Sequence, residues 1–392
     1  MLVRSSSIRA VRCRRSRRSA TPALALALVA ALAACGPPVT QTTPARPAPA
    51  TMPAASTAPG TASNAIWPLK TREHVDLWLH GYALMMTDTA KVPLFRRGYA
   101  DSIDRRKAAT STVTVLDANR DQLRSQLAQR PSLEQGQFVP LYFADWAELR
   151  RAGTVFLETD GNPSRASSPQ LARMVAFLAG IYPTPADRDW LRLFLLGLDD
   201  EQVKFFQAYW SEQQAERAPV LAAVQREWQA RARPKLQGFL NNTRQNTGDI
   251  MLSLALGGEG RTVSGGSTES VVAVTFPATA AAADEAVYVF VHEVVGQVAQ
   301  QAVEDNTTPA EKRDGVAASL QSMAAVRGGA LLLQRAAPEL VEGYMGYYLS
   351  VASPASAAGD QATQAAFERA FPLPTAIRDA IARQLESILA GI

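Results

Sequence analysis

Apolar side chains recur at helical spacing along most of the first half of the chain. The segment 72–87 is dense enough in apolar residues to form a buried helix. Ser168 and Thr184 each stand directly before a proline, a combination typical of helix starts. Residues 199–232 also follow the helical period, and we expect Pro219 to kink or divide that helix.

Patterns typical of strands are shorter and fewer. Residues 112–116 and 154–158 are rich in β-branched side chains, which favour strands. Farther along, in residues 250–256 and 270–276, two sets of side chains occupy alternate positions. This alternation is typical of a strand whose two faces have different surroundings. A glycine-rich stretch, 257–269, separates them, so we expect a hairpin with a long loop.

A helix is expected over 282–305, and nearly all of its faces are apolar. Such a helix belongs in the interior of a protein. We expect no membrane-spanning helix, because no apolar stretch reaches the roughly 20 residues that one requires. The predicted fold class is mainly α with a small β-sheet (α+β), in which the helix over 282–305 follows the hairpin. We divide the folded part into a helical subdomain with two short β segments, 66–246, and a second subdomain, 247–392.

Composition narrows the class of protein. Of 392 residues, 47% are apolar and 19% are charged, which is ordinary for a globular chain, and two cysteines are too few for a disulfide scaffold. The net charge of +4 arises in residues 1–34, which hold seven arginines and no acidic residue. The remainder carries 33 basic and 36 acidic residues, a net charge of −3. We therefore expect no nucleic-acid partner, which would require a basic patch on the folded domain.

The first segment has the layout of a secretory signal, with arginines followed by an apolar run. Its last residues, L-A-A-C ending at Cys35, resemble the lipobox of bacterial lipoproteins. The resemblance implies a signal peptide over 1–34, cleavage before Cys35, and a membrane anchor through lipid on the Cys35 thiol. The alternative is a plain signal peptide that contains Cys35 by chance. Because the leader contains paired arginines, export by the twin-arginine route is an alternative to export by the Sec route.

The segment after the anchor is rich in proline, alanine and threonine. Residues 35–65 hold a single charge, Arg46, and we expect a disordered tether that spaces the domain from the membrane. In lipoproteins, an aspartate after the lipidated cysteine favours retention at the inner membrane. Because this chain has Gly36 there, the resemblance implies the periplasmic face of the outer membrane.

His292 and Glu293 stand side by side in the middle of the predicted buried helix. Burying both is costly unless each finds a partner. The surrounding V-F-V-H-E-V-V-G resembles the active-site helix of zincin metallopeptidases. In that family, His-Glu-x-x-His supplies two zinc ligands and a glutamate that activates the metal-bound water. In the gluzincin branch, a glutamate from a later helix is the third ligand; the candidates are Glu339 and Glu342, and Glu342 is preferred.

The motif is incomplete, because Gly296 stands where the second histidine is expected. One interpretation is a degenerate zincin fold without catalytic zinc. A second is a working metal site with an unusual third ligand, in which His292 and Glu342 bind zinc and Glu293 is the general base. A third is a purely structural pair satisfied by neighbours such as Arg327, which could form a buried ion pair with Glu293 or Glu342.

We expect a lipid-anchored cell-envelope protein whose zincin-like domain is non-catalytic and has a binding or scaffold role, with no cofactor. The alternative is a metal-dependent peptidase that holds zinc. For the other candidate residues, the patterns favour structural roles. His74 and His80 are expected to be core or cap residues, and Tyr344, Tyr347 and Tyr348 are expected to serve in packing.

Overall fold

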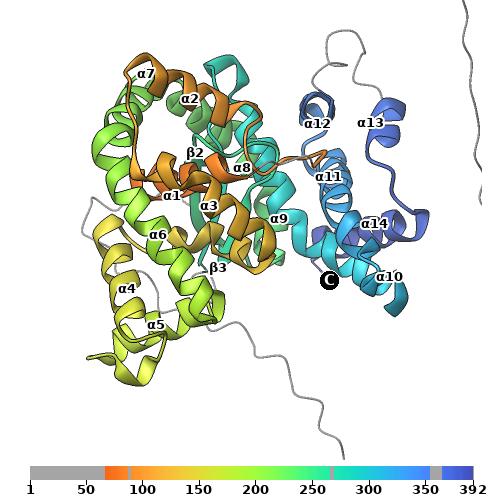
Figure 1. The fold of residues 1–392 in the computed structure, drawn as a ribbon. Coiled ribbons are helices and arrows are strands. Elements are labelled where there is room, and N and C mark those ends of the chain that lie inside the picture. Colours follow the sequence, from red (N-terminus) through yellow and green to blue (C-terminus); the bar gives the residue numbers. More distant parts are fainter. Residues whose placement is uncertain (1–66, 87–89, 265–268, 354–363, 392) are drawn as a thin grey trace, which may run out of the picture. The chain divides into compact units, whose positions relative to one another are not determined.

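A four-stranded mixed sheet lies among helices in the computed structural model, which describes residues 67–86, 90–264, 269–353 and 364–391 (Figure 1). The strands are β1 (Leu69–Lys70), β2 (Thr247–Ser253), β3 (Arg261–Ser264) and β4 (Glu269–Thr275). Their order is β1-β2-β4-β3, with β1 parallel to β2, β2 parallel to β4, and β3 antiparallel to β4. The predicted class, mainly α with a small β-sheet, is confirmed.

The expected hairpin of 250–256 with 270–276 is wrong, because β2 and β4 run parallel. Ile250 lies opposite Val272 in this parallel pair, while Thr262 of β3 lies opposite Val272 on its other side. The antiparallel partner of β4 is therefore the short strand β3, inside the glycine-rich stretch. Alternating apolar side chains define the two faces of a strand but not the direction of its partner, which is why the pattern could not predict this pairing.

Helices make up most of the described chain before β2. They are α1 (Glu73–Met85), α2 (Tyr99–Ala109), α3 (Val115–Gln129), α4 (Trp146–Glu158), α5 (Pro169–Ile181), α6 (Pro185–Glu201), α7 (Gln207–Glu227) and α8 (Arg233–Asn242). Two π-helical segments, Gln202–Phe206 and Trp228–Ala232, link α6 to α7 and α7 to α8. The helical period over 199–232 is thus confirmed, but Pro219 lies inside α7 and does not divide it.

The predicted helix starts before prolines are confirmed. At the start of α5, the Ser168 hydroxyl accepts a hydrogen bond from the backbone N–H of Leu171 at 3.2 Å. At the start of α6, Thr184 and Asp187 each accept a bond from the other's backbone N–H, which forms a capping box. These bonds satisfy donors that a helix leaves unpaired at its N-terminus.

Two predicted β segments are wrong. Residues 154–158 lie inside α4, where Phe156 is fully buried. Residues 112–116 form no strand; they include Thr114, the N-cap of α3, whose hydroxyl accepts a hydrogen bond from the backbone N–H of Asp117 at 3.2 Å. Strand preference of β-branched residues is weak, and here capping and burial at helical spacing outweigh it.

Helix α9 occupies the centre of the second half of the chain. The helices there are α9 (Asp284–Asp305), α10 (Pro309–Arg313), α11 (Val316–Ala336), α12 (Val341–Ala352), α13 (Gln364–Ala370) and α14 (Thr375–Ala390). Helix α9 packs against β4 on one side and against α11 and α14 on another (Figure 1). Most of its side chains are buried, as the sequence predicts.

One hydrophobic core extends across the predicted boundary at 246/247. The ring of Trp67 meets Phe290 of α9 edge-on, with centroids 5.1 Å apart, and Trp228 packs on the same ring at 4.6 Å. Strand β1 also pairs with β2 across this boundary. The boundary therefore marks a change from helices to sheet within a shared core.

Helix α11 is long and apolar enough to cross a membrane by length and composition, which corrects the expectation that no segment reaches that size. Half of its most apolar window is buried, and the helix packs against α9 and α14. Buried core helices meet the same criteria. We interpret α11 as a core helix.

Candidate functional site

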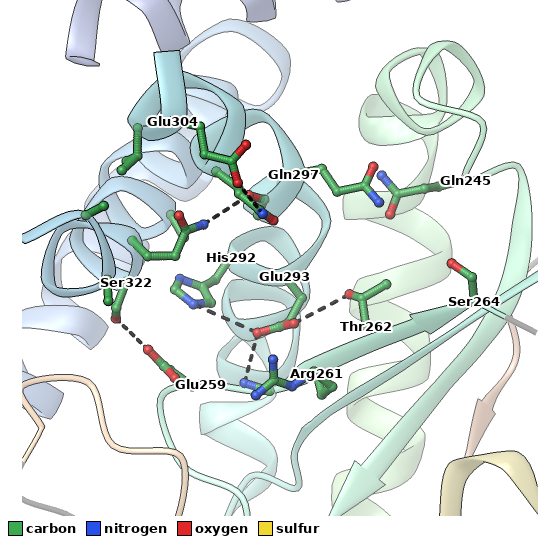
Figure 2. Close-up of a pocket in the computed structure, with 18 residues that line it drawn as sticks. Gln245, Glu259, Arg261, Thr262, Ser264, His292, Glu293, Gln297, Glu304 and Ser322 are labelled. Atoms are coloured by element: carbon green, nitrogen blue, oxygen red, sulfur yellow. Dashed lines mark hydrogen bonds and ion pairs between the residues drawn. The ribbon is translucent and has the colours of Figure 1, made fainter. Parts of the chain in front are cut away.

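A pocket of about 700 Å³ lies beside α9, between β3 and α11 (Figure 2). Glu259 and Gly260, which precede β3, form part of one wall, and Arg261 and Thr262 of β3 continue it. The other lining residues come mainly from α9 and α11: Gln245, Ser264, His292, Glu293, Gly296, Gln297, Gln300, Val303, Glu304, Ala317, Ala318, Gln321, Ser322 and Ala325. The pocket thus includes the pair that the sequence singles out.

His292 is buried in the pocket wall, with 4% of its surface exposed. Burial, assisted by the Arg261 guanidinium, lowers the pKa of its imidazole to about 4, so the ring is neutral at pH 7. Its Nδ1 has no hydrogen-bond partner within the described chain. Its Nε2 lies 3.9 Å from Oε1 of Glu293, which is too long for a hydrogen bond. The neutral ring is therefore a polar group without a close protein partner.

Glu293 points from α9 toward the edge strand β3. Its carboxylate accepts a hydrogen bond from the backbone N–H of Gly260 at 3.1 Å and a long one from Thr262 Oγ1 at 3.5 Å. Burial raises the pKa of the Glu293 carboxyl to about 7, against the opposing charge of Arg261. Near neutral pH, the carboxyl thus exists in both protonation states.

Gly296 lies one turn after His292 on α9 and also lines the pocket. A Cβ built at Gly296 would have no heavy atom within 4 Å. The position at which the zincin motif places its second imidazole is therefore open space. The backbone carbonyl of Gly296 accepts a hydrogen bond from Gln321 Nε2 at 3.4 Å across the pocket.

These residues do not fit a zinc site. Within the described ranges, no group of three or more His, Cys, Asp or Glu side chains could hold a metal ion. Glu342 is exposed in the first turn of α12 and does not line the pocket, and Glu339 pairs with Lys235 instead. A zinc-binding histidine normally donates its second ring N–H to a fixed partner, and Nδ1 of His292 has none in this part of the chain.

Arg327 does not pair with Glu293 or Glu342. Its guanidinium bonds to Glu368 at 3.0 Å and lies over the ring of Phe367, 5.7 Å from the centroid. The expected ion pair in the His-Glu site is therefore wrong. The sequence places Arg327 on a buried helix, but which face of α11 it occupies depends on how that helix packs.

The three tyrosines of α12 pack as predicted, and two of them also position a wall of the pocket. Tyr347 and Tyr348 donate hydrogen bonds to the backbone carbonyls of Gly257 and Gly258 at 3.2 and 3.1 Å. Tyr344 bonds to a carbonyl of α11. The chain segment 257–260 is thereby held between α12 on one side and Glu293 on the other.

His74 and His80 are core residues, as predicted, and neither lines the pocket. His74 Nε2 contacts the backbone carbonyls of Pro140 and Phe143 at 3.2 and 3.0 Å. His80 Nε2 donates to the Glu201 carboxylate at 2.9 Å. Neither ring is free to approach His292 as a further metal ligand.

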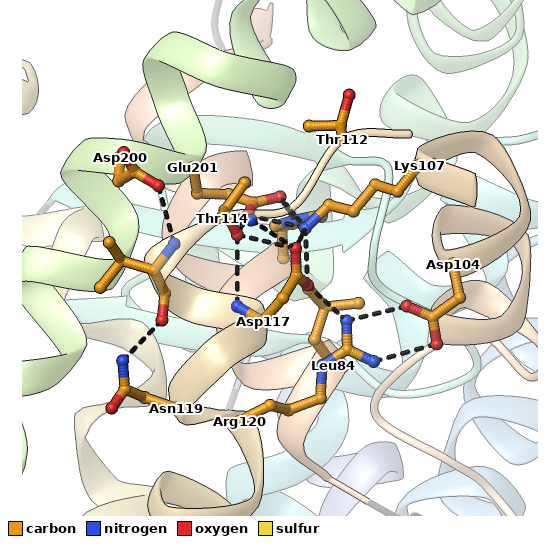
Figure 3. Close-up of polar contacts among 12 residues, drawn as sticks. Leu84, Asp104, Lys107, Thr112, Thr114, Asp117, Asn119, Arg120, Asp200 and Glu201 are labelled. Carbon is orange, nitrogen blue, oxygen red and sulfur yellow. Dashed lines mark hydrogen bonds and ion pairs between the residues drawn. The ribbon is translucent and has the colours of Figure 1, made fainter. Parts of the chain in front are cut away.

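Glu201 is the centre of a buried polar cluster that the sequence pattern did not predict (Figure 3). It accepts hydrogen bonds from Lys107 Nζ at 2.7 Å and from Thr114 Oγ1 at 2.6 Å, and Lys107 also pairs with Asp117 at 2.9 Å. Burial alone would raise the pKa of the Glu201 carboxyl. The hydrogen bonds from His80 and Lys107 outweigh this effect and hold that pKa below its usual value. With its charges paired, this cluster joins α1, α2, α3 and α6.

Comparison of the chain with protein-family models, with curated proteins and with solved structures finds no match. The predicted signal peptide over 1–34, the lipidation site Cys35 and the tether over 35–65 lie outside the described residues.

Proposed function

We propose that this chain is a lipid-anchored cell-envelope protein whose zincin-like domain binds a ligand without hydrolysing it. The proposal is supported by the pocket around His292 and Glu293, in which open space lies at Gly296, the position of the second histidine in the zincin motif. Its volume of about 700 Å³ lies in the range of small-molecule sites, about 300–1,000 Å³. A ligand can therefore occupy the place that a metal and its substrate would share in a zincin.

The position of the pair in the fold supports the zincin-like character. Zincins place an edge strand of the sheet before the active-site helix. Here β3 is the edge strand of the described sheet, and it lines the pocket beside α9. Glu293 is bonded to the start of this strand through the N–H of Gly260.

The chemistry of the pair favours binding over hydrolysis. A zincin hydrolyses peptides because its metal polarises the carbonyl and lowers the pKa of the attacking water. Here His292 supplies one imidazole and Gly296 supplies none, so the described pocket lacks the roughly three protein ligands that zinc requires. Glu293 alone could accept a proton from water, but it would have no activated water to act on.

We further propose that lipid on Cys35 anchors the protein at the periplasmic face of the outer membrane, with 35–65 as the tether. The support is the leader over 1–34 and the lipobox-like sequence that ends at Cys35. Replacing Cys35 with serine should move the protein from the membrane fraction to the aqueous fraction. A C35S protein that stays with the membrane would contradict the anchor, and intact-mass analysis of the wild type checks for acyl chains.

Metal analysis of the purified wild-type protein tests the binding function against the alternative peptidase. We expect no stoichiometric zinc and no peptide hydrolysis, with or without added zinc. Stoichiometric zinc that is lost on His292→Ala, together with hydrolysis that a chelator abolishes, would establish the metal-dependent peptidase instead. A His74→Ala variant is the control, because His74 is a buried histidine outside the pocket.

A further inference from the structure

The pocket is unusually rich in side-chain amides. Glutamines line it from three directions: Gln245 from the segment before β2, Gln297 and Gln300 from α9, and Gln321 from α11. A side-chain amide carries a donor and an acceptor in one plane. The pocket therefore offers many hydrogen-bonding groups that carry no charge.

Three of these four amides donate hydrogen bonds within the protein. The NH₂ groups of Gln245, Gln300 and Gln321 donate to Val294 O, to Glu304 and to Gly296 O. Their carbonyl oxygens accept no hydrogen bond from the described residues. The amide oxygens are therefore available to a ligand that donates hydrogen bonds.

The charged groups of the pocket have partners of their own. Glu259 accepts a hydrogen bond from Ser322, and Glu304 accepts one from Gln300. Glu293 accepts the N–H of Gly260, and the Arg261 guanidinium lies 5.0 Å from the ring centroid of Phe138. Three carboxyl groups against one guanidinium disfavour an anionic ligand.

Apolar lining is confined to small side chains. Val303, Ala317, Ala318 and Ala325 are the apolar side chains among the described lining residues. Peptide recognition depends on pockets that receive alternate side chains of the peptide. A lining of alanines and one valine provides no deep apolar pocket of that kind, so a peptide is disfavoured.

We infer that the pocket binds a neutral saccharide, whose hydroxyl groups donate to the amide oxygens of Gln297, Gln300 and Gln321. This inference rests on the proposed binding function and names its ligand class. A saccharide carries many hydroxyl donors, so it matches a lining rich in amide and carboxylate acceptors, and it needs no large apolar pocket.

Calorimetric titration of the full-length protein with tetra-N-acetylchitotetraose and maltotetraose, two neutral tetrasaccharides, tests the inference. We expect at least one to bind, and Gln300→Ala to weaken that binding about tenfold, the effect of losing one good hydrogen bond. The matched control is Gln301→Ala. Gln300 and Gln301 are both exposed on α9 and bond to the acid four residues on at 2.7 Å, but only Gln300 lines the pocket.

Each result separates the ligand class from the proposed function. Binding that weakens in Gln300→Ala and persists in Gln301→Ala supports a saccharide in this pocket. Binding of tetra-alanine in place of both sugars overturns the saccharide but leaves a binding protein. Binding of neither sugar, or equal binding by wild type and Gln300→Ala, overturns the inference. Zinc-dependent hydrolysis of peptides overturns both the inference and the proposed function.

Discussion

Burial moves the pKa values of His292 and Glu293 in opposite directions, because it disfavours the charged form of each group. The pKa falls to about 4 for His292 and rises to about 7 for Glu293. Between about pH 4 and pH 7 the pair is therefore mostly uncharged. This state suits a pocket that receives a neutral ligand, and no metal is needed to balance a charge.

Replacing Glu293 with glutamine keeps the shape of the side chain and removes its ionisation. In the wild type, the folded-state pKa of about 7 lies above the ordinary value of 4.5, so stability is lost as pH rises from 4.5 through 7. We therefore expect E293Q to gain stability over wild type across this window, by up to about 3 kcal/mol at about pH 8. Urea unfolding at about pH 5 and about pH 8 measures the difference.

The control for this prediction is Glu304→Gln, which removes an exposed carboxylate from the same pocket. Its stability relative to wild type should hardly change between the two pH values. Equal pH dependence of wild type and E293Q would show that the Glu293 carboxyl is not perturbed.

At the scale of single residues, the sequence predicted the pair but not its surroundings. His292 and Glu293 stand out because two ionisable groups interrupt an apolar helix. Their partners could not be predicted, since Gly260 and Thr262 lie more than 30 residues away in the glycine-rich stretch, whose path in the fold its composition does not determine. Glu342 failed as a ligand candidate because spacing along a helix does not tell which way that helix faces.

At the scale of elements, the segment 257–260 connects the sheet to the pocket. The carbonyls of Gly257 and Gly258 accept bonds from tyrosines of α12, and the N–H of Gly260 donates to Glu293. A Cβ at Gly260 would lie 2.1 Å from the backbone oxygen of Ala273 in β4. Only glycine allows this close approach of the segment to the sheet.

Replacing Gly260 with alanine should therefore destabilise the protein by about 1–3 kcal/mol, the usual cost of overpacking. Because the obstructing atom belongs to the backbone, the segment must move away and the bond to Glu293 must lengthen. Chemical unfolding measures the stability. The control is Gly238→Ala in α8, where a Cβ meets nothing within 4 Å and where alanine should stabilise the helix by about 0.5–1 kcal/mol. Equal stability of the two variants would contradict the close contact.

Elements with local signals were predicted, and elements that depend on distant partners were not. The capped helices α5 and α6 and the apolar helix α9 are encoded by neighbouring residues. The parallel pairing of β2 with β4 is not, because it depends on the path of the intervening chain. Residues 154–158 were predicted wrongly for a similar reason. Their local preference for a strand is outweighed by the packing of α4, which buries Phe156 as part of a helix.

At the scale of the whole molecule, the buried cluster around Glu201 ties together helices far apart in sequence. Lys107 is 4% exposed and bonds to both Glu201 and Asp117. Composition and periodicity gave no sign of it, because each of its charged residues looks like an ordinary surface position. Only packing of α1, α2, α3 and α6 brings the charges together.

Removing the charge of Lys107 should be strongly destabilising, because Glu201 would stay buried without its cation. We expect Lys107→Met to lower the free energy of unfolding by about 3–5 kcal/mol, as in other broken buried ion pairs. The neighbouring Arg106→Met is the matched control. Arg106 pairs with Glu212 on the surface, and its loss should cost at most about 1 kcal/mol. Similar losses in both variants, measured by urea unfolding, would contradict a structural role for the cluster.

We expect the His292 pocket to function without a metal, because Gly296 contributes no side-chain ligand. Zinc titration by calorimetry, comparing wild type with Gly296→His, tests this expectation. The open space at Gly296 should accept the new imidazole, and zinc should then bind about tenfold or more tightly than to wild type. Gln297→His, one residue farther around α9, should not show this gain. Tight binding of one zinc ion to the wild-type protein, unchanged by Gly296→His, would contradict the claim.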